Sequence, residues 1–103
     1  VPKCSKCGGL IRPDIVWFGE MLPQGVFDEA EKAAKKCDVC FVVGTSAVVF
    51  PAANIPIIAK QYGALVVEVN LTNTDISSLV DETLLGPAGE VLPKLIEAVK
   101  NFN

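Results

Sequence analysis

Short runs of apolar, largely β-branched residues alternate along this chain with longer segments in which apolar and charged positions mix. The short runs predict strands, and the two most apolar of them suit strands buried on both faces, as in a parallel sheet. The mixed segments repeat their apolar positions at helical spacing. The expected strands are residues 15–18, 39–43, 64–69 and 82–85. The expected helices are residues 23–36, 52–62 and 90–102.

This order of elements predicts an α/β fold. Strands and helices alternate, and right-handed crossovers would stack the strands into a Rossmann-like parallel sheet with helices on both faces. The chain has 103 residues, of which 50% are hydrophobic. That is enough for the core of one small globular domain.

Charge and hydropathy exclude several classes of protein. The chain has 9 basic and 12 acidic residues, a net charge of −3, and its basic residues are scattered, so no nucleic-acid surface is expected. No apolar run is long enough for a membrane span and no signal peptide opens the chain, which predicts a cytoplasmic protein with no membrane partner. The chain begins with Val1 and not with Met, which suggests a fragment.

Small and polar residues follow each expected strand. The carboxyl ends of parallel strands meet at one edge of a sheet, which is where such sheets bind ligands. The segments are Gly19-Glu20, Gly44-Thr45-Ser46, Asn70 and Gly86-Pro87-Ala88. Each has a simpler explanation, because glycines and asparagines also serve tight turns, and the phosphate-loop and GxGxxG patterns are absent. The convergence of four segments on one edge favours a ligand site.

The four cysteines form two pairs, and the chain has no histidine. Cys4 and Cys7 are two residues apart and precede two glycines, which predicts half of a tetrahedral zinc site with the other ligands outside this chain. A redox Cys-x-x-Cys is the lesser alternative, since no helix follows directly. Cys37 ends an expected helix and Cys40 lies within a strand, so both are interpreted as small core residues. Without histidine, Ser-His-Asp and Cys-His catalysis are excluded within the chain.

Several segments together resemble one family. The match runs the whole chain in order, and the combination looks like the C-terminal half of a sirtuin, an NAD-dependent protein lysine deacylase. The segments are Arg12-Pro-Asp-Ile-Val-Trp-Phe-Gly-Glu20, Gly44-Thr45-Ser46 with Val49-Phe-Pro-Ala-Ala53, Val69-Asn70, and Gly86-Pro-Ala-Gly-Glu-Val-Leu-Pro93.

The resemblance implies two parts and three sets of site residues. Residues 1–9 would be the second half of a zinc-binding module, half of a zinc-ribbon knuckle, and residues 10–103 the C-terminal half of the NAD-binding domain. Structural zinc would be bound by Cys4 and Cys7. NAD would be bound by Gly44, Thr45, Ser46, Asn70, Leu71, Thr72 and Ala88. An acyl-lysine peptide would add as a strand between two segments that contain Val16, Phe18, Gly19, Glu20, Val48 and Val49.

The implied activity is transfer of an acyl group from lysine to ADP-ribose with release of nicotinamide. The family's Gly-Ala-Gly-Ile-Ser segment, its Gln-Asn-x-Asp segment and its catalytic histidine belong to an N-terminal half that is not in this sequence. The chain therefore holds no catalytic residue and should be inactive alone. Its expected partners are an acylated protein and the missing half.

Two other functions remain open at this point. The chain would be a non-catalytic NAD- or ADP-ribose-binding domain if it bound the nucleotide without further segments. It would be a zinc interaction module if all four cysteines held one metal ion. The second alternative predicts that changing Cys37 or Cys40 to serine releases the metal.

Overall fold

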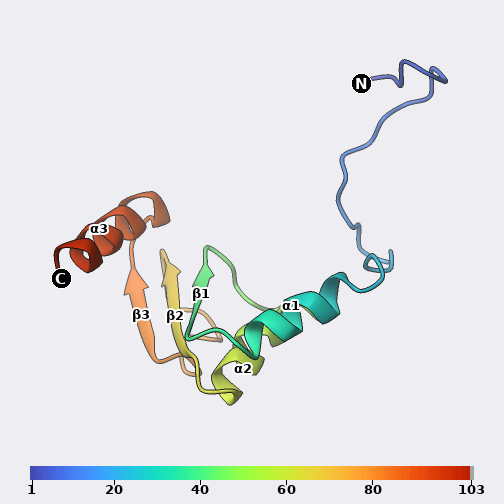
Figure 1. The fold of residues 1–103 in the computed structure, drawn as a ribbon. Coiled ribbons are helices and arrows are strands. Elements are labelled where there is room, and N and C mark those ends of the chain that lie inside the picture. Colours follow the sequence, from blue (N-terminus) through green and yellow to red (C-terminus); the bar gives the residue numbers. More distant parts are fainter. Residues whose placement is uncertain (103) are drawn as a thin grey trace.

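The computed structural model describes residues 1–102, which contain a three-stranded parallel sheet and three helices (Figure 1). In chain order the elements are α1 (Val26–Ala34), β1 (Val39–Val43), α2 (Asn54–Gln61), β2 (Leu65–Asn70), β3 (Glu82–Leu85) and α3 (Ala88–Asn101). The sheet order is β1-β2-β3, and both pairings are parallel. The predicted α/β class is confirmed, and the expected strands 39–43 and 82–85 have the predicted bounds.

Strand β2 is the centre of the sheet. Its residues 66–69 are all buried, because β1 and β3 flank it and other segments cover its faces. The register places Val43 opposite Val69, and Asn70 opposite Leu85. All three strands therefore end at the same edge, as the sequence predicts.

The hydrophobic core lies on one face of this sheet. It joins the end of α1, strands β1 and β2, α2 and the segment between β2 and β3, and it consists of Ala34, Val42, Ala59, Ala64, Val66 and Ile76. Cys37 and Cys40 pack against this cluster, which confirms their interpretation as core residues. Helix α3 contacts β2 and lies on the side of the sheet away from α1 and α2 (Figure 1).

Residues 15–18 do not form the predicted strand. They belong to an irregular segment in residues 1–20 that runs away from the sheet (Figure 1). Strand-forming composition is weak without a neighbouring strand to pair with, and none lies beside this segment in residues 1–102. Ile15 and Trp17 are consequently half exposed, at 54% and 52%.

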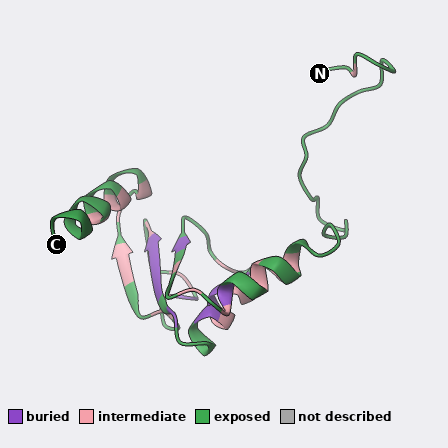
Figure 2. Cartoon of the chain, in the orientation of Figure 1, coloured by how far each residue is buried: buried purple, intermediate pink, exposed green. Residues whose placement is uncertain are grey.

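Large apolar side chains remain exposed on several elements. Figure 2 shows the buried residues concentrated on β2 and α2, whereas α3 and the first 20 residues are mostly exposed. On β1 the exposed apolar residues are Val39, Phe41 and Val43, and on α3 they include Ile96 and Val99. Surfaces of this kind usually contact another protein segment. No helix within residues 1–102 is long and apolar enough to cross a membrane.

Asp81, at the start of β3, is hydrogen-bonded to α2 and to β2. Its Oδ1 accepts a hydrogen bond from Lys60 Nζ at 2.7 Å, and its Oδ2 accepts one from Val66 N at 2.8 Å. Its own backbone N–H donates to Val66 O at 2.9 Å. Lys60, and then the Val66 N–H, lower the pKa of Asp81 below its ordinary value.

We expect Asp81→Asn to destabilise the protein in a pH-dependent way. Because the folded pKa lies below the ordinary value of about 3.9, the stabilisation is present above that value and is lost as the pH falls through the folded pKa. Urea midpoints followed by circular dichroism should therefore differ between variant and wild type at about pH 7 and converge as the pH falls through the folded pKa of Asp81.

Asp75→Asn is the matched control, because Asp75 enters the hydrogen bonds of this segment through its backbone carbonyl, which accepts from Ser78 Oγ at 3.4 Å. A difference between Asp81→Asn and wild type that stays constant across the pH range would contradict the prediction.

Candidate functional site

Two hydrogen bonds fix the turn after β1 to the end of β2, and a third lies within the turn. Gly44 N donates to Val69 O at 2.9 Å, and Gly44 has a φ of +63°, a conformation that favours glycine. Thr45 Oγ1 accepts from Ala47 N at 3.1 Å. The Asn70 side chain donates from Nδ2 to Thr45 O at 3.0 Å. The turn therefore has a defined shape, with Thr45 and Ser46 exposed.

Asn70 connects this turn to the turn after β3. Its Oδ1 accepts from Leu71 N at 2.9 Å, and its backbone carbonyl accepts from Gly86 N at 2.9 Å. The Asn70 side chain thus stabilises its own turn, which is the simpler interpretation of an asparagine at this position. With its backbone carbonyl, Asn70 also brings together three of the four segments that the sequence places at this edge.

The remaining residues predicted for NAD lie around this centre. Leu71 and Thr72 follow Asn70 directly and are exposed, and Ala88 begins α3 two residues after Gly86. The amino end of α3 is therefore at the same edge. A helix amino end carries partial positive charge and unpaired N–H groups, which suit a phosphate.

An apolar cavity of about 560 Å³ lies next to the segment that leaves this edge. Its walls come from residues 15–20, from the start of α1 and from residues 49–52. Of the residues predicted to flank a peptide, five line it: Val16, Phe18, Gly19, Glu20 and Val49. Val48 does not line it, and is 54% exposed.

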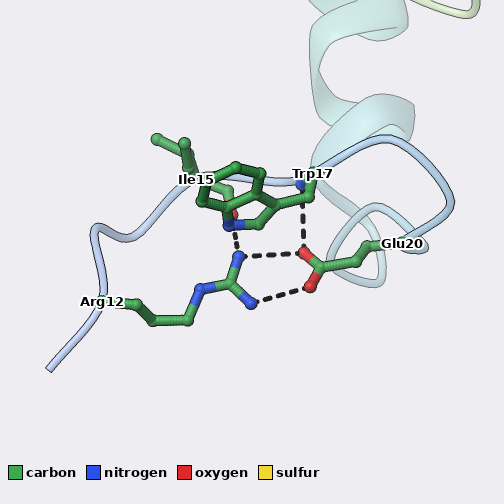
Figure 3. A network of polar contacts seen from close by, with 4 residues as sticks. All are labelled: Arg12, Ile15, Trp17 and Glu20. Carbon is green, nitrogen blue, oxygen red and sulfur yellow. Dashed lines mark hydrogen bonds and ion pairs between the residues drawn. The ribbon is translucent and has the colours of Figure 1, made fainter. Parts of the chain in front are cut away.

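A network of polar contacts around Arg12 and Glu20 orders residues 15–20, which line one wall of this cavity (Figure 3). Arg12 donates from Nη1 to Glu20 Oε1 at 2.7 Å and from Nη2 to Oε2 at 3.1 Å, a two-point ion pair. Its Nη2 also donates to Ile15 O at 3.0 Å, and Trp17 N donates to Glu20 Oε2 at 3.0 Å. The guanidinium carbon lies 5.3 Å from the centre of the Trp17 ring. The segment is thereby held in one loop without a sheet.

Arg12, and next the Trp17 N–H, lower the pKa of Glu20 below its ordinary value. The carboxylate therefore stays charged at neutral pH. Arg12 is a site residue to which the sequence assigns no role. The sequence feature that could have indicated this ion pair is an arginine and a glutamate on either side of a short apolar run. The run was instead interpreted as a strand.

Cys4 and Cys7 lie in a tight turn. Cys4 N donates to Gly9 O at 2.8 Å, Gly8 N donates to Cys4 O at 2.9 Å, and Lys3 bridges to Leu10. The backbone N–H groups of Cys7 and then Lys6 lower the pKa of the Cys4 thiol, and the Cys7 side chain adds to this. An environment that favours the thiolate suits a metal ligand. No group of three or more cysteine, aspartate or glutamate side chains able to hold a metal ion occurs within the described residues.

A sequence model of the Sir2 family matches residues 1–51. The NAD-dependent protein deacylase of Pyrococcus furiosus is 52% identical over 103 residues, which are all of this chain and 41% of that protein. The NAD-dependent protein deacylase 2 of Pyrobaculum aerophilum is 57% identical over 99 residues, 96% of this chain and 40% of that protein.

Solved structures agree with this likeness. A Sir2 homologue in complex with NAD has a TM-score of 0.86 at 49% identity, over 97% of this chain and 39% of that chain. Sir2Af2 bound to a myristoylated histone peptide has a TM-score of 0.88 at 48% identity, over 98% of this chain and 43% of that chain. The chain is therefore similar over its whole length to proteins of the Sir2 family, the sirtuins, and spans about two-fifths of the length of the relatives that it matches.

Proposed function

We propose that this chain is the C-terminal part of an NAD-dependent protein lysine deacylase, which transfers an acyl group from lysine to ADP-ribose and releases nicotinamide. The observation that carries the proposal is the edge where Asn70 ties Thr45 and Gly86 together. The segment that leaves this edge leads directly into the apolar cavity. The relatives named NAD-dependent protein deacylase, and the related structures with NAD and with an acylated peptide, support it.

The nucleotide would occupy the carboxyl edge of the sheet. Gly44, Thr45 and Ser46 would contact its phosphates and ribose, because a glycine turn with hydroxyl side chains allows close approach and donates hydrogen bonds. Asn70, Leu71 and Thr72 would lie at the adenine ribose. Ala88, at the amino end of α3, would lie at the adenine.

The acylated peptide would add as a strand to residues 15–18. In an extended segment, alternate residues present their backbone groups to the same side. Here Ile15 and Trp17 are engaged with Arg12 and Glu20, whereas the backbones of Val16 and Phe18 make no hydrogen bond within the described residues. Those two residues are therefore available to pair with a peptide, with Val48 and Val49 on its other side.

The catalytic base and the nicotinamide pocket would come from the rest of the enzyme. The chain has no histidine, so the family's acid–base step has no residue here. The outer edge of β1 is unpaired within residues 1–102, and Phe41 beside it is 46% exposed. We propose that the N-terminal half continues the sheet at this edge, so that residues 10–103 complete the NAD-binding domain.

Structural zinc is part of the proposal. The turn at Cys4 and Cys7 holds two cysteines, the ligand type of a structural zinc site, and residues 1–9 would be the second half of that zinc-binding module. Zinc there would fix the module's fold and take no part in the acyl transfer. A cytoplasmic location, with no membrane or nucleic-acid partner, stays a prediction.

The protein expressed from its native coding region should release nicotinamide from NAD when an acylated lysine peptide is present. Asn70→Ala should raise the KM for NAD by about tenfold, since the turn at Thr45 loses the hydrogen bond that fixes it. Asn73→Ala is the matched control, because Asn73 is exposed three residues further on.

Absence of nicotinamide release would overturn the proposed deacylase function. NAD binding by residues 1–103 alone, combined with that absence, would favour the non-catalytic NAD-binding domain.

Arg12→Ala should weaken binding of the acylated peptide. Losing the ion pair frees the loop that presents Val16 and Phe18, so the KM for peptide should rise by about fivefold while the KM for NAD stays unchanged. Trp17 is the single tryptophan of residues 1–103, so its emission in this chain should report the same change.

In the wild type this emission should change on acidification, because the ion pair is intact above the ordinary pKa of a glutamate and is lost as the pH falls through the lowered pKa of Glu20. Lys35→Ala, which removes a cation paired with Glu31 and lying over the Tyr62 ring, is the control. An equal rise in the KM for peptide in both variants would count against a specific role for Arg12.

The metal content should depend on one cysteine pair only. Zinc measured by inductively coupled plasma mass spectrometry should be lost from Cys4→Ser and Cys7→Ser, since a site with three ligands holds the ion weakly. It should be retained by Cys37→Ser and Cys40→Ser, whose side chains pack against the core. Loss of zinc from the second pair of variants would instead support the four-cysteine module.

A further inference from the structure

Glu68 is a buried carboxylate to which neither the family resemblance nor the proposed site gives a role. It lies in the middle of β2, and its relative exposure is 0%. Its side chain points to the same face as Val66, where α2 and the segment between β2 and β3 pack. A charge buried in this way is costly unless hydrogen bonds satisfy its oxygens.

Hydroxyl groups supply those hydrogen bonds. Thr74 Oγ1 donates to Glu68 Oε1 at 2.5 Å, Ser77 Oγ donates to Oε2, and Thr83 Oγ1 donates to Oε2 at 3.4 Å. Ser77 Oγ also accepts from Thr74 N at 2.8 Å, so its hydroxyl connects the loop backbone to the carboxylate. Burial acts to raise the pKa of Glu68, but the Ser77, Thr74 and Thr83 hydroxyls and the Asn70 side chain outweigh it and lower this pKa.

Two of these hydroxyls lie in the loop of residues 71–81, which connects β2 to β3. The loop has no helix or strand. Ile76 is buried in the core and Val80 packs against it, whereas Thr74 and Ser77 are bonded to Glu68. Leu71 and Thr72, at its start, belong to the proposed adenine-ribose site.

We propose that Glu68 is a positioning residue for the nucleotide: its carboxylate holds the 71–81 loop, through Thr74 and Ser77, in the conformation that binds the adenosine end of NAD. The inference rests on the proposed function. Glu68 is fully buried and would not touch the ligand, and it acts through the exposed residues 71 and 72.

The expected kinetic signature follows from this arrangement. When one hydroxyl is removed, the loop opens more often, and NAD must bind from the smaller population in which the loop is closed. The KM for NAD should therefore rise. The KM for the acylated peptide and kcat at saturating NAD should not change, since the peptide segments lie on other elements.

Adjacent serines offer a matched pair for the test in the complete protein. Ser77 donates to Glu68, whereas Ser78 donates only to the backbone carbonyl of Asp75 at 3.4 Å. Ser77→Ala should raise the KM for NAD about fivefold to tenfold, because a hydrogen bond to a buried charge is lost. Ser78→Ala should leave it unchanged, and Ser77→Thr, which keeps the hydroxyl, should restore it.

Thr74→Val is a second loop variant and should resemble Ser77→Ala, with Thr74→Ser as its conservative counterpart. Equal KM values for NAD in Ser77→Ala and Ser78→Ala, with an active wild type, would overturn this inference and leave the proposed function standing. A lower kcat and melting temperature with no change in the KM for NAD would show a purely structural role and would also overturn it. An inactive wild type would overturn the proposed function and this inference with it.

Discussion

The parallel pairing of β1 and β3 onto β2 is the constraint on which the rest of the structure depends. Its register places Val43 beside Val69 and Asn70 beside Leu85, so every strand ends at one edge. Asn70 can then bond to the turn after β1 and to the turn after β3 at once. A shift of either strand by one residue would turn its side chains to the opposite face and separate these turns. The carboxyl edge of the sheet is therefore a consequence of the strand pairing. The residues at this edge determine which ligand it can bind.

Two carboxylates shape the two sides of the site, in opposite environments. Glu20 is exposed and pairs with Arg12, so solvent screens the attraction and the geometry of the two-point contact matters more than its charge. Glu68 is buried without an ion pair in the described part of the chain and relies on hydroxyl groups. The first orders a loop that would otherwise lack any partner. The second fixes a loop to the sheet, because an unsatisfied buried charge would be far more costly than an ordered loop.

Sequence patterns predicted the elements that are stabilised locally or by simple burial. Residues 39–43 and 82–85 form strands with the expected bounds. Residues 39–43 are an apolar run rich in β-branched residues, which packs well in a sheet. Residues 15–18 have a similar composition but no neighbouring strand in residues 1–102, so the strand predicted there was wrong. Glu68 was included in a predicted strand without a role. Its partners lie 6, 9 and 15 residues further along the chain, and only the tertiary fold shows that they converge on it.

The distribution of chemistry along this chain accords with the proposed function, in which the catalytic residues lie outside the chain. The described residues supply turns, hydroxyls and backbone groups that fit a nucleotide and a peptide, but the chain has no histidine to move a proton. Exposed large apolar residues occur in the first 20 residues, on β1, in residues 48–50 and on α3. Within the described residues the outer edge of β1 is unpaired, and an unpaired edge is a template for pairing with another strand. In the proposed function this chain is the binding side of the site, and a segment that pairs with β1 would bring the reactive groups.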